Sequence, residues 1–415
     1  MKLFSSGKVA FAKASICLLL LNAAAQASDW LQWGGPARNF KTDSKGLANS
    51  WPQSGPRRLW SRPLGEGHST VLVEGSKLYT MYGRGEQEVV ISMDAATGKT
   101  IWEYAYNSPS AGMNYEYGKG PHATPLIVGD LIFTAGSLGQ MLCLNKNTGK
   151  LVWSHDLWKE LKGTVEDRGY SCSPIAYKDT VIMTVGGAGQ TLVAFSQKDG
   201  RIVWKKHDLM TSPSSHLLIN VDGQDQLVAF LGKQIIGVDP ANGDLLWSHT
   251  HETDWGLNIS TPVWGEDNLL FFSSAYNGGS RVLRLTRTGA KTTATEVWFH
   301  RRLRVHHGTI IRIGDLVYGS SGDFGPAFLS AVEVKTGKIV WQDRSFPKAS
   351  FIYADGKFII LDEDGNLTLA SATQEGLKVL SKASVLQSIS WTAPTLAGTK
   401  LYIRDRRNIA AFDLS

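Results

Sequence analysis

Histidines recur at similar places along this 415-residue chain, each ahead of a short apolar run. His68, His122, His216 and His307 take this position in four different parts of the sequence. Neutral imidazoles that converge on one point are common ligands of zinc and other transition metals. The adjacent rings of His306 and His307, however, would point to opposite faces of a strand and could not readily chelate one ion. We therefore predict polar residues at a solvated surface and assign no metal.

Aromatic and charged residues accompany these histidines. Arg168, together with nearby tyrosines and a tryptophan, could hold a planar anionic or sugar-like ligand through stacking and bidentate hydrogen bonds. The candidate binding residues are His68, Tyr115, Tyr117, His122, Arg168, Tyr170, His216, Trp255, Asn258, His306, His307 and Trp391. No local spacing of serine, histidine and aspartate marks a catalytic triad, so the catalytic residues are unassigned.

A ten-residue phrase repeats along the chain and indicates how these residues are positioned. It reads MDAATGKTIW at 93–102 and returns as LNKNTGKLVW, FSQKDGRIVW, VDPANGDLLW and VEVKTGKIVW. Its last residue falls at Trp60, Trp102, Trp153, Trp204, Trp247, Trp298 and Trp341, with Leu380 in the equivalent place. The copies are 39 to 51 residues apart, and short β-branched runs separated by Gly, Asp and Asn fill the intervals. Four strands per repeat of this length are typical of a β-propeller blade.

The two ends of the chain decide the number of blades. The last stretch, ISWTAPTLAGTKLYIRDRRNIAAFDLS, supplies three strands, and PRRLWSRPL around Trp60 supplies the missing fourth. Pairing the two ends closes the ring and removes an exposed sheet edge. We predict an all-β, eight-bladed β-propeller of four-stranded antiparallel blades. Seven blades is the alternative, if the Leu380 copy is not a blade.

We interpret the repeated phrase as a structural element that packs one blade against the next. Gly98 and its equivalents supply the positive φ that the turn before the outermost strand requires. Trp102 and its equivalents are expected to dock against the neighbouring blade, and Ile101 is expected to be covered too. Binding residues must then lie elsewhere, in the loops that enter the innermost strands and in the turns between second and third strands. Histidines on opposite blades would stand too far apart to share a metal ion.

The first residues predict export. Three lysines precede an apolar run at 16–21, and Ala25-Gln26-Ala27 is typical of a signal-peptide cleavage site. We expect cleavage after Ala27 and a periplasmic or secreted protein. The predicted organisation is a signal peptide at 1–27, a lead-in segment at 28–54 and a single propeller domain at 55–415.

Charge and cysteine content limit the classes of partner that we expect for the protein. Removing three lysines and no acids lowers the formal net charge from +6 to +3, and no basic cluster favours nucleic acid. No later segment is long enough to span a membrane. Cys143 and Cys172 remain after cleavage, and the sequence leaves open whether they pair. We expect a monomer whose partner is another protein or a small-molecule ligand.

The phrase ending at Trp102 resembles A-x-D-x-x-T-G-K-x-x-W, the tryptophan-docking motif of pyrroloquinoline-quinone (PQQ) repeat propellers. With DWLQWGGPARN, GYSCSP and HHGT, it makes the whole mature chain look like a family of secreted bacterial PQQ-like repeat proteins. The outer-membrane assembly factor BamB and the quinoprotein alcohol dehydrogenases share the fold that this resemblance implies. Without a lipidation signal, the chain would not be anchored in the manner of BamB.

Likeness to the dehydrogenases would imply PQQ and a calcium ion as cofactors. Their quinone lies between an indole and a disulfide of adjacent cysteines, but this chain has no such pair, and its residues do not match their calcium ligands. A shared fold does not by itself transfer an activity. We therefore predict a binding or scaffolding module with no assigned cofactor. The alternative is a PQQ-dependent oxidoreductase acting on alcohols or sugars.

Overall fold

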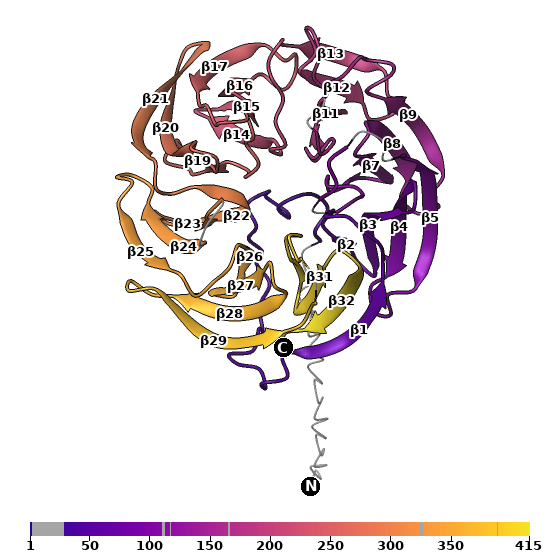
Figure 1. Cartoon of the computed structure of the whole chain (residues 1–415), viewed down its shortest axis with the longest axis vertical. Coiled ribbons are helices and arrows are strands. Elements are labelled where there is room, and N and C mark those ends of the chain that lie inside the picture. The colour runs from indigo at the N-terminus through magenta and orange to yellow at the C-terminus, as the bar shows by residue number, and fades with distance from the viewer. Residues whose placement is uncertain (2–28, 110–112, 117, 165–166, 324–326, 388) are drawn as a thin grey trace.

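The protein is all-β and forms a ring. The computed structural model describes residues 1, 29–109, 113–116, 118–164, 167–323, 327–387 and 389–415. In these residues, strands β1 to β32 form eight four-stranded antiparallel sheets that radiate from the centre (Figure 1). The prediction of an eight-bladed propeller is therefore confirmed, and the Leu380 copy belongs to a blade of its own.

Seven blades are continuous in sequence, with their first strand innermost and their fourth outermost. The first and second blades contain, respectively, β2 (Leu72–Glu74), β3 (Lys77–Arg84), β4 (Gln87–Asp94) and β5 (Thr100–Asn107), and β6 (Leu126–Val128), β7 (Leu131–Ala135), β8 (Gln140–Asn145) and β9 (Leu151–Asp156). The third blade contains β10 (Ile175–Tyr177), β11 (Thr180–Thr184), β12 (Leu192–Ser196) and β13 (Ile202–Lys206). The fourth blade contains β14 (Leu217–Val221), β15 (Gln224–Phe230), β16 (Gln234–Val238) and β17 (Leu245–Thr250). The fifth blade contains β18 (Val263–Trp264), β19 (Leu269–Ser274), β20 (Gly279–Thr288) and β21 (Lys291–His300). The sixth blade contains β22 (Val305–Ile313), β23 (Leu316–Ser321), β24 (Phe328–Glu333) and β25 (Ile339–Asp343). The seventh blade contains β26 (Ala349–Ala354), β27 (Lys357–Asp362), β28 (Asn366–Ala372) and β29 (Leu377–Ser384).

The eighth blade combines both ends of the chain. It contains β30 (Thr395–Ala397), β31 (Lys400–Arg404), β32 (Asn408–Asp413) and, as its outermost strand, β1 (Arg57–Pro63). The pairing of β1 with β32 is antiparallel and places Arg57 opposite Asp413. This pairing joins the start of the propeller to its end, as the sequence predicted.

The indoles of the repeated phrase contact the next blade along the chain. The Trp102 Nε1–H donates to the Lys146 carbonyl at 2.9 Å, and its ring lies against Gly149. Trp60, Trp153, Trp204 and Trp298 make the same pair of contacts with the blades that follow them. Each such contact joins two blades, so it belongs to the packing of the ring.

Two copies depart from this geometry because the next copy of the phrase is degenerate. Trp247 donates to the Gln226 side chain of its own blade at 2.7 Å, and the following blade carries the long hairpin of β20 and β21. Trp341 Nε1 is buried without a hydrogen-bond partner among the described residues, and no side chain or backbone lies within 4 Å of a Cβ added at Gly376.

One expectation about the outer strands is wrong. Ile101 is 47% exposed, and Val152 and Val203, which precede the docking tryptophans of later blades, are exposed as well. Sheets twist, so neighbouring blades diverge toward the rim and cover only the tryptophan face of the outermost strand. The middle strands, in contrast, are buried along almost their whole length, as in β12.

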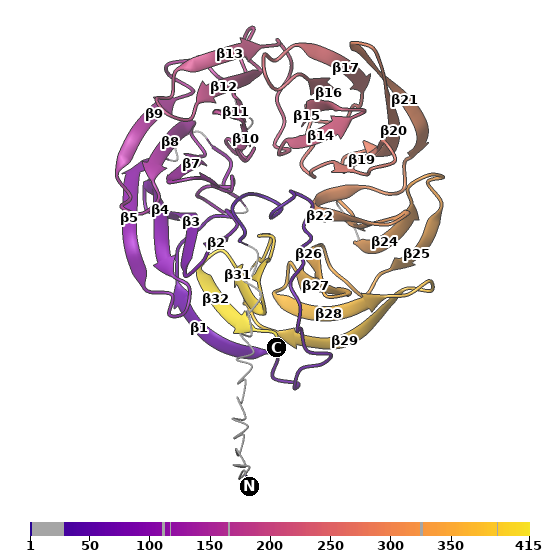
Figure 2. The same cartoon turned by 180° about the vertical axis from the view of Figure 1, so that it is seen from behind.

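The segment before β1 crosses the centre of the ring (Figure 2). Trp30 pairs with Val73 in the first blade, and the carbonyl of Leu31 accepts from Ile127 in the second. Further along, Thr42 N donates to Tyr353 O in the seventh blade. The segment therefore spans the channel at the end where the first and second strands turn, and we call residues 29–48 the plug.

Cys143 and Cys172 are both buried and both free, which answers the pairing question that the sequence left open. Within the described part of the chain, no helix is long and apolar enough to cross a membrane.

Candidate functional site

A cavity of about 910 Å³ lies at the channel mouth opposite the turns that the plug covers. The loops that enter the innermost strands line it, together with turns between second and third strands such as those of Tyr276 and Glu363. These are the segments in which the sequence predicted binding residues. Seven of the predicted residues line the cavity, namely His68, His122, Arg168, Trp255, His306, His307 and Trp391.

The remaining predicted residues are placed differently. Tyr170 and Asn258 are buried behind the wall, where Tyr170 donates to Val185 O at 2.8 Å and Asn258 Nδ2 to Leu231 O at 2.6 Å. His216 is also buried, 3.6 Å from the Cys172 thiol and 3.0 Å from the Thr184 hydroxyl. Tyr115 is half-buried and does not line the cavity, although its neighbours Asn114 and Glu116 do. The prediction for Tyr117 lies outside the described residues.

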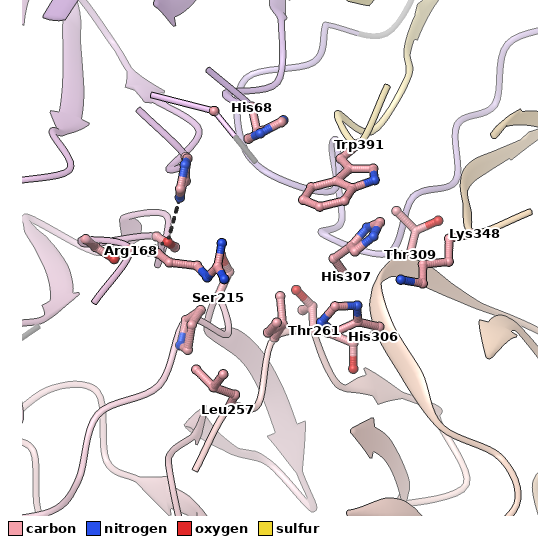
Figure 3. A pocket seen from close by; sticks show the side chains of 18 of the residues that line it. His68, Arg168, Ser215, Leu257, Thr261, His306, His307, Thr309, Lys348 and Trp391 are labelled. Atoms are coloured by element: carbon pink, nitrogen blue, oxygen red, sulfur yellow. Dashed lines mark hydrogen bonds between the residues drawn. The ribbon is translucent and has the colours of Figure 1, made fainter. Parts of the chain in front are cut away.

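Three aromatic rings form one side of the cavity (Figure 3). The Trp391 ring centroid lies 4.5 Å from that of His307 and 5.5 Å from that of His68, with interplanar angles of 34° and 31°. Such offset, tilted pairs are favourable ring contacts. The Trp391 indole also donates to a Glu363 carboxylate oxygen at 3.1 Å. These contacts hold the tryptophan in one orientation.

The imidazoles of His306 and His307 are uncharged at neutral pH. Burial, helped by Lys348 and opposed by Asp323, lowers the pKa of His306 to about 4. Burial also lowers the pKa of His307 well below its ordinary value, with His306 and Lys348 adding to the effect. Desolvation disfavours the protonated ring, and a nearby cation does the same. The neutral His306 ring is 2.7 Å from the Tyr276 hydroxyl, whereas neither His307 nitrogen has a hydrogen-bond partner among the described residues.

A second imidazole site lies on another part of the wall. Burial, with Arg168 nearby, lowers the pKa of His122 to about 4. Its Nδ1 is 3.2 Å from the Ser171 hydroxyl, and its buried Nε2 has no hydrogen-bond partner in the described chain. The wall thus presents several neutral rings, each of which can donate through one nitrogen and accept through the other.

Cations and carboxylates both line the cavity. Arg168 and Lys348 are half-buried and direct their charged ends toward its middle from opposite sides (Figure 3). Glu116 and Asp167 are exposed. Asp323 pairs with Arg304 at 3.1 Å.

The plug supplies the end of the cavity that the sequence prediction missed. Trp33 and Phe40 line the cavity from the plug and contact one another edge to face, with ring centroids 5.1 Å apart. Trp33 Nε1 donates to the Thr261 hydroxyl at 2.8 Å. Lys348, Tyr276, Leu257 and Ile259 are further lining residues that were not predicted. The aromatic, glycine-containing stretch LQWGGPARNF was the available signal, but the sequence does not show that it reaches the channel.

The residues present do not fit a PQQ and calcium centre of the dehydrogenase kind. Trp391 already makes tilted ring contacts with two histidines, and both cysteines are buried and free. Among the described residues, no three histidine, cysteine or carboxylate side chains are grouped so that they could hold a metal ion. Calcium prefers several carboxylate and carbonyl oxygens around one point. We therefore derive no reaction step through these cofactors.

Comparisons with known proteins agree on the repeat family. A PQQ-repeat family model described as the outer membrane protein assembly factor BamB matches residues 86–343. BamB from Yersinia pestis is 21% identical over 304 residues, which cover 68% of this chain and 72% of that protein. The solved europium-containing methanol dehydrogenase superposes with a TM-score of 0.68 at 14% identity, covering 93% of this chain and 89% of the other, so this likeness shows the fold alone.

The likeness to enzymes in sequence is more limited. The quinoprotein alcohol dehydrogenase PedH from Pseudomonas putida is 27% identical over 135 residues, or 30% of this chain. The match spans only 21% of PedH. Because the family model matches more than half of the chain, the protein belongs to the BamB-like family of PQQ-repeat propellers.

Proposed function

We propose that this protein is an extracytoplasmic binding module that holds a small molecule in the cavity at its channel mouth. The observation that carries the proposal is the cavity itself, which combines an aromatic wall, neutral histidines and two inward-directed cations with an aromatic end supplied by the plug. Ligand sites of proteins are commonly concave, largely apolar and equipped with a few convergent polar groups.

Location and partners are part of the same proposal. The lysine-rich, apolar start of the chain with its small-residue site at Ala27 supports export and cleavage. The likeness to BamB, whose name describes an assembly factor of the outer membrane, supports a location outside the cytoplasm. The protein acts as a monomer, and a protein partner would bind outside the cavity.

The first experiment asks whether the cavity binds small molecules at all. Thermal unfolding of the mature chain is measured against a panel of aromatic carboxylates, their neutral amides and simple sugars. A ligand that binds only the folded state raises the unfolding temperature. We expect at least one class to do so, and Trp391→Leu to abolish the effect. The control Trp158→Leu alters an exposed tryptophan that does not line the cavity.

The same preparation tests the competing enzyme function. The mature chain is titrated with PQQ and Ca²⁺ while quinone absorbance and dye reduction by alcohols and sugars are followed. We expect no turnover. Sustained dye reduction that depends on both additives would replace the binding proposal with a quinoprotein oxidoreductase. A panel without any stabilising compound would refute the small-molecule site and leave protein scaffolding as the function.

A further inference from the structure

We propose that the ligand of the channel cavity is an organic monoanion, whose single carboxylate lies beside Lys348 and His307 while a neutral ring-bearing body fills the apolar end. This inference rests on the proposed binding function and adds the chemical class of the ligand. Four features of the cavity support it.

The first feature is a cation without a salt bridge. Lys348 precedes β26, is half-buried, and directs its ammonium group toward His306 and His307 (Figure 3). It is near enough to depress the pKa of both rings, and no described carboxylate forms a salt bridge with it. A partly desolvated ammonium group gains most from a carboxylate that comes within hydrogen-bond distance.

The second feature is the unsatisfied His307 ring. Its two nitrogens are shielded from solvent, and neither has a hydrogen-bond partner in the described chain. A neutral imidazole always carries one N–H donor, and a buried donor without an acceptor is destabilising. If the ring turns so that its N–H faces the cavity, a carboxylate held by Lys348 supplies the missing acceptor.

The third feature limits the ligand to one negative charge. Arg168 and Lys348 are the fixed cations of the lining, whereas Glu116, Asp167, Asp323 and Glu363 are its carboxylates. The lining carries more carboxylates than cations, so each further acidic group on the ligand would be repelled by this excess of like charge. A polycarboxylate quinone is therefore a poorer occupant than a molecule with a single acid group.

The fourth feature concerns the body of the ligand. Leu257, Ile259, Trp33 and Phe40 form an apolar part of the lining. The hydroxyls beside them are already engaged, since Thr261 accepts from Trp33 and Thr309 donates to Phe351 O at 2.7 Å. A neutral aromatic or alicyclic ring is the chemistry that such a surface buries favourably.

The test compares three matched probes by isothermal titration calorimetry on the mature chain. They are 2-naphthoate, its neutral counterpart 2-naphthamide, and naphthalene-2,6-dicarboxylate. We expect the monocarboxylate to bind tightest. Lys348→Gln should weaken its binding about tenfold or more, because a charge-assisted contact is lost. His307→Gln serves as a second variant, and Lys378→Gln, which alters an exposed lysine on β29, should leave the affinity unchanged.

The outcomes separate this inference from the function on which it rests. Equal affinity for the amide, equal or tighter binding of the dicarboxylate, or unchanged naphthoate binding by folded Lys348→Gln and His307→Gln would overturn the monoanion class. So would a failure of 2-naphthoate to bind. In each of these cases, stabilisation by a sugar or another neutral compound, lost in Trp391→Leu, would leave the binding function standing. Circular dichroism of each variant confirms that the propeller is folded.

Discussion

At the scale of single residues, the repeated phrase shows how one glycine and one indole join two blades. Gly149 adopts a φ of +71°, which L side chains rarely tolerate, and its bare Cα lets the Trp102 ring lie against it. The indole N–H then reaches the carbonyl of Lys146, so the ring is fixed by packing and by one hydrogen bond. The glycine is therefore required for two separate reasons, its φ and its lack of a side chain.

These two reasons can be separated by a pair of substitutions. A methyl group added at Gly149 would lie 2.7 Å from the Trp102 ring, whereas at Gly129, whose φ is +55°, it would meet nothing within 4 Å. We expect both Gly149→Ala and Gly129→Ala to cost about 1–2 kcal/mol for the left-handed backbone. Gly149→Ala should cost about 1–3 kcal/mol more from overpacking. Urea denaturation measures the free energy of unfolding of both variants. Equal losses of stability would mean that the Trp102 ring moves aside from the added methyl group at no cost.

At the scale of elements, the blades could be predicted and the site only in part. The register of Trp102 and its equivalents fixes the outermost strands, and the turns between them fix where the loops must emerge. Which loop residues converge depends on contacts between distant blades, and no periodic pattern encodes these. His307 and Trp391 were found because the segments at the start of the innermost strands are unusually polar and aromatic, whereas Lys348 resembles any solvated lysine. The plug has no repeat at all, so its path across the channel could not be derived.

The plug should matter for both stability and binding. Trp33 is half-buried, donates to Thr261 and lines the cavity. We expect Trp33→Ala to lower the free energy of unfolding by about 2–3 kcal/mol, less than for a fully buried tryptophan, and to weaken any ligand of the cavity. The exposed Trp158→Ala is the control. Unchanged ligand affinity in Trp33→Ala, measured by calorimetry, would show that the plug is only a structural cover.

At the scale of the whole molecule, the ring is held by one non-local strand pairing. Blades within the chain form from neighbouring segments, but the eighth blade must bring β1 to β32 across the entire sequence. The Asp413 carboxylate lies at this junction and forms salt bridges with Arg57 and Lys400, each at 2.6 Å. It also accepts a hydrogen bond from the Thr399 hydroxyl at 2.9 Å. Its side chain is buried, whereas Arg57 is largely exposed and Lys400 is partly exposed.

The contribution of Asp413 to the stability of the β1–β32 pairing should therefore depend on pH. Burial raises the pKa of Asp413, but hydrogen bonds from Lys400 and Arg57 outweigh this and hold it well below its ordinary value of 3.8. Since the unfolded chain takes up this proton at a higher pH than the folded chain, the stabilisation is complete above about pH 4 and declines as the pH falls further. We expect Asp413→Asn to cost about 1–2 kcal/mol at pH 7, a modest value because the cations are solvated.

The deficit of Asp413→Asn relative to the parent protein should shrink between about pH 4 and pH 3, because the parent aspartate begins to lose its own advantage there. Asp315→Asn removes an exposed salt bridge with Lys335 on a surface turn and should leave stability unchanged across the same range. Guanidinium denaturation at each pH measures both variants. If Asp413→Asn lost no stability at pH 7, the β1–β32 pairing would be held by its strand hydrogen bonds and apolar contacts alone. A loss that persisted undiminished at pH 3 would instead point to disturbed packing of Phe412 and its neighbours, with no part played by charge.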